Sequence, residues 1–480
     1  MANEEVSSRK IFTGFIWFII SKLFPALSGL VIFFVTSRSI TAEDLGLITL
    51  SISIITFIIY LSYNGFCDAI IQIKELKQKH VDTVFFLNTI SSTIFFTISV
   101  VIIFILTFFG VFPQRLNYIY IILGAKCLLD TLSLLPVALL ARQMEFKAIG
   151  IRTLYSSILA ALVALPVFYY FGSVASLIVN YLISSFCGFV IAWGSSPYPL
   201  RIKFDRASYI DLRHIGVTTT AAKLISSVSF DNIFIGFFGS GSTLGLYSFS
   251  KRVFGIFTDI LSGGISSVTY PLYASLQDDK NKLKESFLKA TFLSALVGIP
   301  AYTGLILLSP SLIPLFFGRQ WIDAVPVLQI SCLLGFITCI GSLQTSLIKG
   351  VGKSMWILKY QCAQQILTIL IAIIFSSQGP VVVMALITIK TFLIWPFTIF
   401  YITKLLSVSV YSYLKNLFKP FISGAVLVCV FYIMKFILGT VNPYFFVVLE
   451  IFTCAVFYIL SILILARHEI TIMLSGLKKK

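Results

Sequence analysis

Charged residues are scarce in this chain of 480 residues, because Asp, Glu, Lys and Arg make up only 11% of it. Soluble globular proteins contain about 25%. Hydrophobic residues make up 58% of the chain, and the mean hydropathy is +0.98. So few charges cannot cover the surface of a water-soluble fold of this size, and so many apolar residues exclude a disordered chain. The composition therefore indicates an integral membrane protein.

The residues that carry most enzyme chemistry are also few. There are three His residues, and the eight Cys residues are scattered without the paired spacing of a metal site. No GxxxxGK[ST] sequence is present to bind a nucleotide, and the longest loop that we predict, 195–214, is too short to form a hydrophilic domain. We therefore expect no metal, no cofactor and no enzyme activity.

Apolar runs of about 20 residues, enough to cross a bilayer core of about 30 Å, recur along the whole chain. They predict an all-α integral membrane protein with about 14 transmembrane helices, at 11–36, 45–66, 82–109, 117–140, 151–171, 173–194, 215–238, 245–272, 287–308, 324–348, 355–376, 379–403, 417–438 and 442–465. The breaks at 171–173, 377–380 and 439–443 are short and contain Gly. They predict tight turns, so the spans on either side of each break should form helical hairpins.

The basic residues alternate along the chain. Of the 36 Lys and Arg residues, 26 lie in every second segment between spans, four lie in the other segments and six lie within spans. This pattern follows the positive-inside rule and predicts that both termini are cytoplasmic. It accounts for most of the net charge of +17 without a nucleic-acid partner, for which neither a compact basic face nor a known module is present.

A short internal match suggests two related halves. Lys22-Leu23 precedes Leu45-Gly46-Leu47 much as Lys223-Leu224 precedes Leu244-Gly245-Leu246. The match divides the first twelve spans into six and six with the same orientation, as in a parallel repeat. We expect an N-terminal lobe at 1–194, a cytoplasmic linker at 195–214, a C-terminal lobe at 215–403, and two appended spans with a basic tail at 404–480.

Ionisable residues within spans are costly and need a partner, water or a function. The basic ones are Lys22, Lys126, Lys223, Lys251, Arg252 and Lys390, and the acidic ones are Asp130, Asp231, Asp259 and Glu450. Lys126 and Asp130 are four residues apart and should share one helix face. Arg252 and Asp259 are seven apart and should also share a face. We interpret Glu450, in the appended pair, as structural.

Lys22 lies near the middle of its span without an acid three or four residues away, and Pro25 follows it. Because Pro removes a backbone donor and crowds the preceding turn, a kink here would act as a hinge beside a water-filled cavity. Lys223 repeats the feature in the second half. We expect both to face one central cavity that takes an anion with an apolar tail, such as a lipid pyrophosphate. Long-range ion pairs with acids on other spans remain the alternative.

Several stretches of the sequence resemble the polysaccharide transporter family, in the superfamily that includes the MATE multidrug exporters. The resemblance is greatest to the colanic-acid-exporter type of lipopolysaccharide biosynthesis protein. It rests on residues 38–47, 65–72, 140–147, 230–236, 244–249, 270–277 and 316–326. The chain departs from the usual pattern at Cys67-Asp68, where small apolar residues are more typical, and at Lys251-Arg252.

The resemblance implies two six-helix lobes in a V shape with two extra helices, in a bacterial plasma membrane. It also implies a flippase that moves an undecaprenyl-pyrophosphate-linked oligosaccharide by alternating access, for O-antigen, capsule or exopolysaccharide assembly. H⁺ or Na⁺ would be the coupling ion. Membrane lipids, a polysaccharide polymerase and a chain-length regulator would be its other partners.

From charge type we expect two groups of site residues. Those that bind the pyrophosphate are Lys22, Lys126, Lys223, Lys251 and Arg252, and those that balance charge or couple an ion are Asp130, Asp231 and Asp259.

Three other functions remain open from the sequence. A MATE-like exporter of organic cations would favour carboxylates in the cavity, whereas the excess here is basic. An exporter of peptidoglycan lipid II is a second alternative, which an essential gene outside any sugar cluster would indicate. A membrane glycan polymerase or ligase tends to need a sizeable outer loop, and the predicted outer loops are short.

Overall fold

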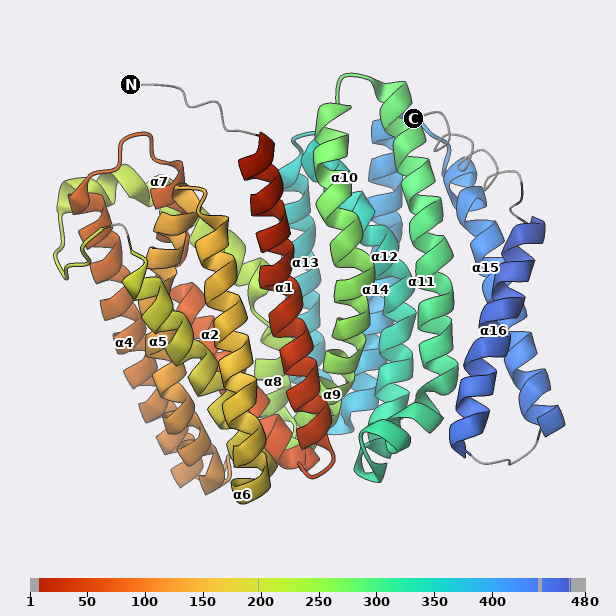
Figure 1. Cartoon of the computed structure of the whole chain (residues 1–480), viewed down its shortest axis with the longest axis horizontal. Coiled ribbons are helices and arrows are strands. Elements are labelled where there is room, and N and C mark those ends of the chain that lie inside the picture. Colours follow the sequence, from red (N-terminus) through yellow and green to blue (C-terminus); the bar gives the residue numbers. More distant parts are fainter. Residues whose placement is uncertain (1–7, 197, 439–442, 466, 468–480) are drawn as a thin grey trace. The chain divides into compact units, whose positions relative to one another are not determined.

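The computed structural model describes residues 8–196, 198–438, 443–465 and 467, and every regular element in these ranges is a helix (Figure 1). By backbone contacts the chain divides into two compact units, Met1–Gly245 and Leu246–Lys480. The helices of the first unit are α1 (Ser8–Ser37), α2 (Ala42–Leu61), α3 (Gly65–Gln72), α4 (Gln78–Phe108), α5 (Gln114–Arg142), α6 (Phe146–Gly194), α7 (Arg206–Ser227) and α8 (Phe230–Phe238).

Helix α9 (Gly241–Thr258) begins in the first unit and continues into the second. It is followed by the π-helix η1 (Asp259–Gly263) and α10 (Gly264–Ser275). The remaining helices are α11 (Lys280–Phe316), the 3₁₀-helix η2 (Arg319–Ala324), α12 (Val325–Gly350), α13 (Ser354–Phe375), η3 (Ser376–Gln378), α14 (Pro380–Leu406), α15 (Val410–Leu438) and α16 (Pro443–Leu465).

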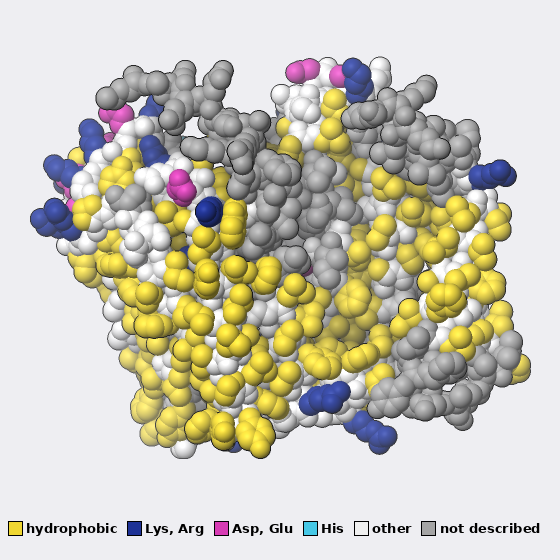
Figure 2. Space-filling model, in the orientation of Figure 1, with side chains coloured by type: hydrophobic (Ala, Val, Ile, Leu, Met, Phe, Trp, Pro, Cys, Tyr) yellow, Lys and Arg dark blue, Asp and Glu magenta, His cyan; other side chains and the backbone are white. Residues whose placement is uncertain are grey.

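The helices have the length and surface of membrane spans. Among the described residues nine helices are long and apolar enough to cross a bilayer, or ten if α7 and α8 form one span bent by 59°. On the face shown in Figure 2, hydrophobic side chains cover the helices and most Lys and Arg side chains lie near their ends. The structure thus confirms an all-α, multi-pass membrane protein, while the count of fourteen spans stays a prediction.

Helix α6 contains two of the predicted spans and folds back on itself. Gly172 interrupts it with φ +85° and ψ −178°, a conformation open mainly to glycine. Two hydrogen bonds join the segments before and after this residue. Ser176 Oγ donates to the carbonyl of Ala164 at 2.7 Å, and Arg152 Nε donates to the carbonyl of Gly188 at 2.9 Å. These contacts between residues 12 and 36 positions apart confirm the hairpin expected at 171–173.

Three predicted spans are not continuous helices. The span at 45–66 breaks into α2 and α3, where Tyr63 has a positive φ of 56°. The span at 215–238 ends near its predicted boundary but bends between α7 and α8. The span at 245–272 passes through the π-helix η1, a rare type of turn that interrupts the regular α-helix. Hydropathy measures only apolar content, so it does not detect these breaks.

The predicted linker 195–214 is fixed to the start of α4. The backbone N–H of Asp205 donates to Thr83 Oγ1 at 3.1 Å, and Gln78 Nε2 donates to the carbonyl of Pro199 at 2.7 Å. Asp205 also caps α7 by accepting from the backbone N–H of Ser208. Helix α7 itself packs mainly on α3 and belongs to the first compact unit. The predicted lobes, their V shape and the limits of the repeat stay predictions, because grouping helices by packing does not test a repeat.

Candidate functional site

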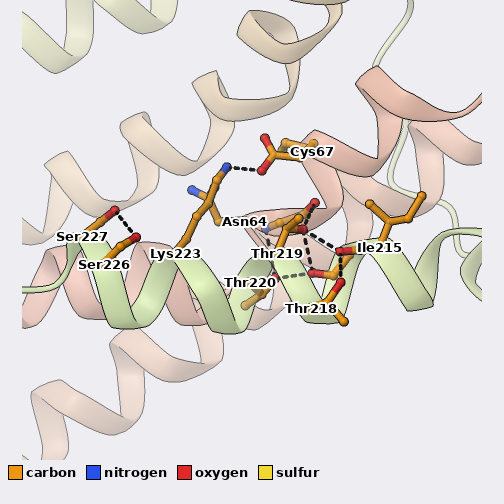
Figure 3. A network of polar contacts seen from close by, with 12 residues as sticks. Asn64, Cys67, Ile215, Thr218, Thr219, Thr220, Lys223, Ser226 and Ser227 are labelled. Carbon is orange, nitrogen blue, oxygen red and sulfur yellow. Dashed lines mark hydrogen bonds and ion pairs between the residues drawn. The ribbon is translucent and has the colours of Figure 1, made fainter. Parts of the chain in front are cut away.

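Two interrupted spans meet at one lysine. Lys223, in α7, places its Nζ 2.8 Å from Asp68 Oδ2 and donates to Asn64 Oδ1 at 2.9 Å (Figure 3). Asp68 lies in the first turn of α3, and Asn64 is the residue before that helix. The side chains of Lys223 and Asp68 are 31% and 30% exposed, respectively. The ammonium group is therefore paired, and the pair is only partly buried.

The break between α2 and α3 leaves backbone groups that must be paired inside a membrane. Asn88, buried in α4, can pair two of them. In the amide orientation that satisfies both groups, its nitrogen lies 3.0 Å from the carbonyl oxygen of Ser62 and 3.1 Å from that of Tyr63. This amide supports the interruption that turns Asn64 and Asp68 toward Lys223.

Two threonines of α7 form hydrogen bonds with the backbone of Gly65, on the α3 side of the break. The backbone N–H of Gly65 donates to Thr220 Oγ1 at 3.0 Å, and Thr219 Oγ1 donates to the carbonyl of Gly65 at 2.9 Å (Figure 3). A Cβ atom on Gly65 would lie only 2.2 Å from the backbone nitrogen of Thr220. Only glycine allows this approach. Because Lys223 lies one helical turn after Thr219 on the same face, the crossing sets the position of its side chain.

Arg142 fixes the far end of α3. Its guanidinium donates to the carbonyls of Ile70 and Ile73 at 2.6 Å, and to those of Ile71 and Lys74 at 3.2 and 3.1 Å. The last carbonyls of a helix have no partners within it, and a cation there also interacts favourably with the helix dipole. This residue, part of the 140–147 stretch in the resemblance, thus has a structural role.

A second ion pair joins Lys126 and Asp130 on α5, as their spacing predicts. The Nζ–Oδ2 distance is 2.5 Å, and the side chains are 18% and 25% exposed. Lys126 also donates to Ser185 Oγ on α6 at 3.2 Å. The pair is satisfied within the first unit, and its role in binding stays a prediction.

The other predicted site residues are spread over the chain. Asp231 is buried in the first turn of α8, and Lys223 pairs with Asp68 instead of with this residue. In the second unit Lys251 Nζ lies 5.3 Å from the centre of the Tyr247 ring, and Arg252 is half-buried. Asp259 is exposed at the start of η1.

Helix α1 runs through Pro25 without a break, so the hinge there stays a prediction. The side chain of Lys22 lies outside the described residues. Lys390, in α14, donates to Gln364 Oε1 at 2.5 Å and to Thr368 Oγ1 at 2.9 Å on α13. Glu450 is buried in α16. In the described part of the chain, no three His, Cys, Asp or Glu residues are grouped to hold a metal.

Comparisons with known proteins agree with the fold. The chain is 28% identical to the lipopolysaccharide biosynthesis protein WzxC of Escherichia coli, covering 69% of this chain and 68% of that protein. It is 23% identical to the teichuronic acid biosynthesis protein TuaB of Bacillus subtilis, over 75% of this chain and 76% of that one. The solved structure of the lipid II flippase MurJ, in an inward closed conformation, superposes with a TM-score of 0.77 at 15% identity, covering 95% of this chain and 100% of that one.

The model of one protein family, described as polysaccharide biosynthesis protein, matches residues 35–326. The matched range is more than half of the chain, and it contains the α2–α3 break, the crossing with α7 and the Lys223 pair. This protein is therefore a member of the polysaccharide biosynthesis protein family.

Proposed function

We propose that the protein is a flippase that moves an undecaprenyl-pyrophosphate-linked oligosaccharide repeat unit across the bacterial plasma membrane for surface polysaccharide assembly. Its family, its helical membrane fold and the likeness of that fold to a lipid II flippase support this function. The two relatives are named for different polysaccharides. The common part of the substrates would then be the lipid diphosphate and not the sugar.

The observation that carries the proposal is the partly exposed Lys223 pair between two interrupted spans. Interrupted spans are the usual framework of substrate sites in transporters, and an ammonium group binds phosphate as a point charge. Asn64 adds an amide beside it. Lys22, Lys126, Lys251 and Arg252 remain further candidates for the phosphates, and Asp130, Asp231 and Asp259 for charge balance or ion coupling.

The charge pattern supports cytoplasmic termini, and the substrate would be taken up from the cytoplasmic leaflet. Alternating access in such folds moves one helical bundle against another around a fixed site. A gradient of H⁺ or Na⁺ would supply the energy. A polymerase and a chain-length regulator would use the product on the outer side.

Transport by purified protein in vesicles tests the proposal. A fluorescent lipid-linked repeat unit is loaded in one leaflet, and its arrival in the other is followed with a quencher that cannot cross the membrane. Lys223→Ala should slow arrival by about tenfold or more, because loss of one charged hydrogen bond costs about 1.5–3 kcal/mol. Lys22→Ala should do the same if its side chain lies in the site.

Lys289→Ala is the matched control. This lysine is also paired with an acid, Glu285, but on an exposed helix end, and its loss should leave the rate unchanged. Wild-type protein that leaves the lipid in place and instead exports organic cations would support a MATE-like exporter. Wild-type protein that lengthens the glycan would establish a polymerase. Equal rates for Lys223→Ala and wild type would remove Lys223 from the site.

A further inference from the structure

The Lys223 site already contains an anion of its own. The Asp68 carboxylate lies where the ammonium group would bind a ligand phosphate, at 2.8 Å. An anionic ligand must therefore replace Asp68 or share Lys223 with it.

The two partners of the pair differ in their freedom to move. Asp68 lies on α3, an eight-residue helix held at its start by Thr220 and at its end by Arg142. Lys223 carries its charge on a flexible four-carbon side chain. When a ligand binds, the ammonium group can turn away from Asp68, while the carboxylate stays in place.

We propose that Asp68 is a specificity-determining residue that reserves Lys223 for a lipid diphosphate and excludes the singly charged phospholipids of the membrane. This inference rests on the proposed function and names what the site rejects. At a given distance, a headgroup with two negative charges attracts the ammonium about twice as strongly as a headgroup with one. Asp68 also repels a diphosphate about twice as strongly, so the gain depends on the ammonium group turning away from Asp68 toward the ligand. Breaking the Lys223–Asp68 pair then costs the same for both lipids, and the diphosphate recovers about twice as much of that cost as a phosphodiester.

Selection of this kind works through a repulsive element. A phospholipid that enters the site brings its negative charge close to Asp68 and gains nothing that compensates. Phospholipids greatly outnumber any lipid-linked sugar in a membrane, so a site with free cations would be filled by them. Asp68 keeps the site selective at the expense of some affinity for the substrate.

The experiment compares wild type with Asp68→Asn, which keeps the size of the side chain and removes its charge. Both are placed in nanodiscs of phosphatidylcholine, and binding of undecaprenyl diphosphate is measured with increasing phosphatidylglycerol, a singly charged lipid. In phosphatidylcholine alone, the variant should bind about tenfold more tightly, a difference of about 1.4 kcal/mol. With phosphatidylglycerol as half of the lipid, the variant should no longer bind undecaprenyl diphosphate more tightly than wild type does. The affinity of wild type should change less than twofold.

Glu285→Gln is the control, since it also removes an acid paired with a lysine, but on an exposed end of α11. It should behave as wild type. Asp68→Ser provides the same test if Asp68→Asn does not fold. A third arm needs no variant: phosphatidic acid, which can carry two charges, should compete with undecaprenyl diphosphate in wild type, while phosphatidylglycerol should not.

The outcomes separate the two proposals. Wild type that does not bind undecaprenyl diphosphate in any lipid would overturn the proposed function. Wild type that binds it while the uncharged variants resist phosphatidylglycerol equally well would overturn only the role of Asp68. Equal competition by the two phospholipids in wild type would also overturn that role.

Discussion

Gly65→Ala should separate α3 from α7 and disable the protein without unfolding it. The new Cβ would lie 2.2 Å from the backbone nitrogen of Thr220, 2.4 Å from the Gly216 carbonyl oxygen and 2.4 Å from Thr219 Oγ1. Ordinary contact begins near 3.4 Å, so the two helices must move apart by about 1 Å. Two of the three atoms belong to the backbone, and no side-chain rotation can relieve the clash.

Overpacking of this kind costs about 1–3 kcal/mol. The shift would lengthen both hydrogen bonds between Gly65 and the threonines, and would move Lys223 away from Asp68 and Asn64. A displacement of about 1 Å at a binding site can reduce activity by up to about 100-fold. We expect transport to fall by at least about tenfold, while the purified protein still elutes as one folded species and unfolds at a somewhat lower temperature.

Gly304→Ala, in α11, is the matched control, because a Cβ atom there meets nothing within 4 Å. It should leave transport and thermal stability close to those of wild type. Normal transport by a folded Gly65→Ala protein would refute the reasoning, since the close crossing of α3 and α7 would then have no part in the site.

Three further predictions concern the first unit. Lys126→Met should destabilise the protein by about 1–3 kcal/mol, because it leaves Asp130 unpaired, and Lys126→Met with Asp130→Leu should restore most of the thermal stability. Arg142→Ala should expose the α3–α4 loop to protease, and Arg142→Lys should not rescue it, because one ammonium group cannot bond all four carbonyls. Hydrogen bonds from the Ser208 side chain and backbone lower the pKa of Asp205. At a pH above the usual pKa of aspartate, the cap should therefore stabilise α7 in full, and this stabilisation should be lost as the pH falls through the lowered pKa. The loss should be seen as faster amide exchange in the first turn of α7. The Asp205→Ala protein should show no such pH step.

Features set by neighbouring residues were predictable from the sequence. The Lys126–Asp130 pair follows from the spacing of four within one helix, and the turn at Gly172 follows from a glycine between two apolar runs. The alternation of basic segments and the helical class depend on composition along the chain and needed no knowledge of packing.

The centre of the candidate site was not predictable in this way. Lys223 is predicted as a charge within a span, but its partner Asp68 is 155 positions earlier in the chain and is not among the acids expected to balance charge, which are Asp130, Asp231 and Asp259. The signal that could have identified the partner was the departure at Cys67-Asp68, an acid where small apolar residues are usual.

The extent of the first compact unit determines where the chain can be divided for expression as two fragments. A fragment that ends at residue 194 would lack α7 and α8, so the amide of Gly65 would have no Thr220 and the ammonium partner of Asp68 would be missing. The turn at Gly239 and Ser240, between α8 and α9, is the better place to divide it. Co-expressed fragments 1–239 and 240–480 would keep α7 and α8 with α2 and α3, whereas the start of α9, where Gly241 and Gly245 pack closely on α2, would have to dock from the second fragment. Their reassembly could be used to attach separate labels to the two pieces.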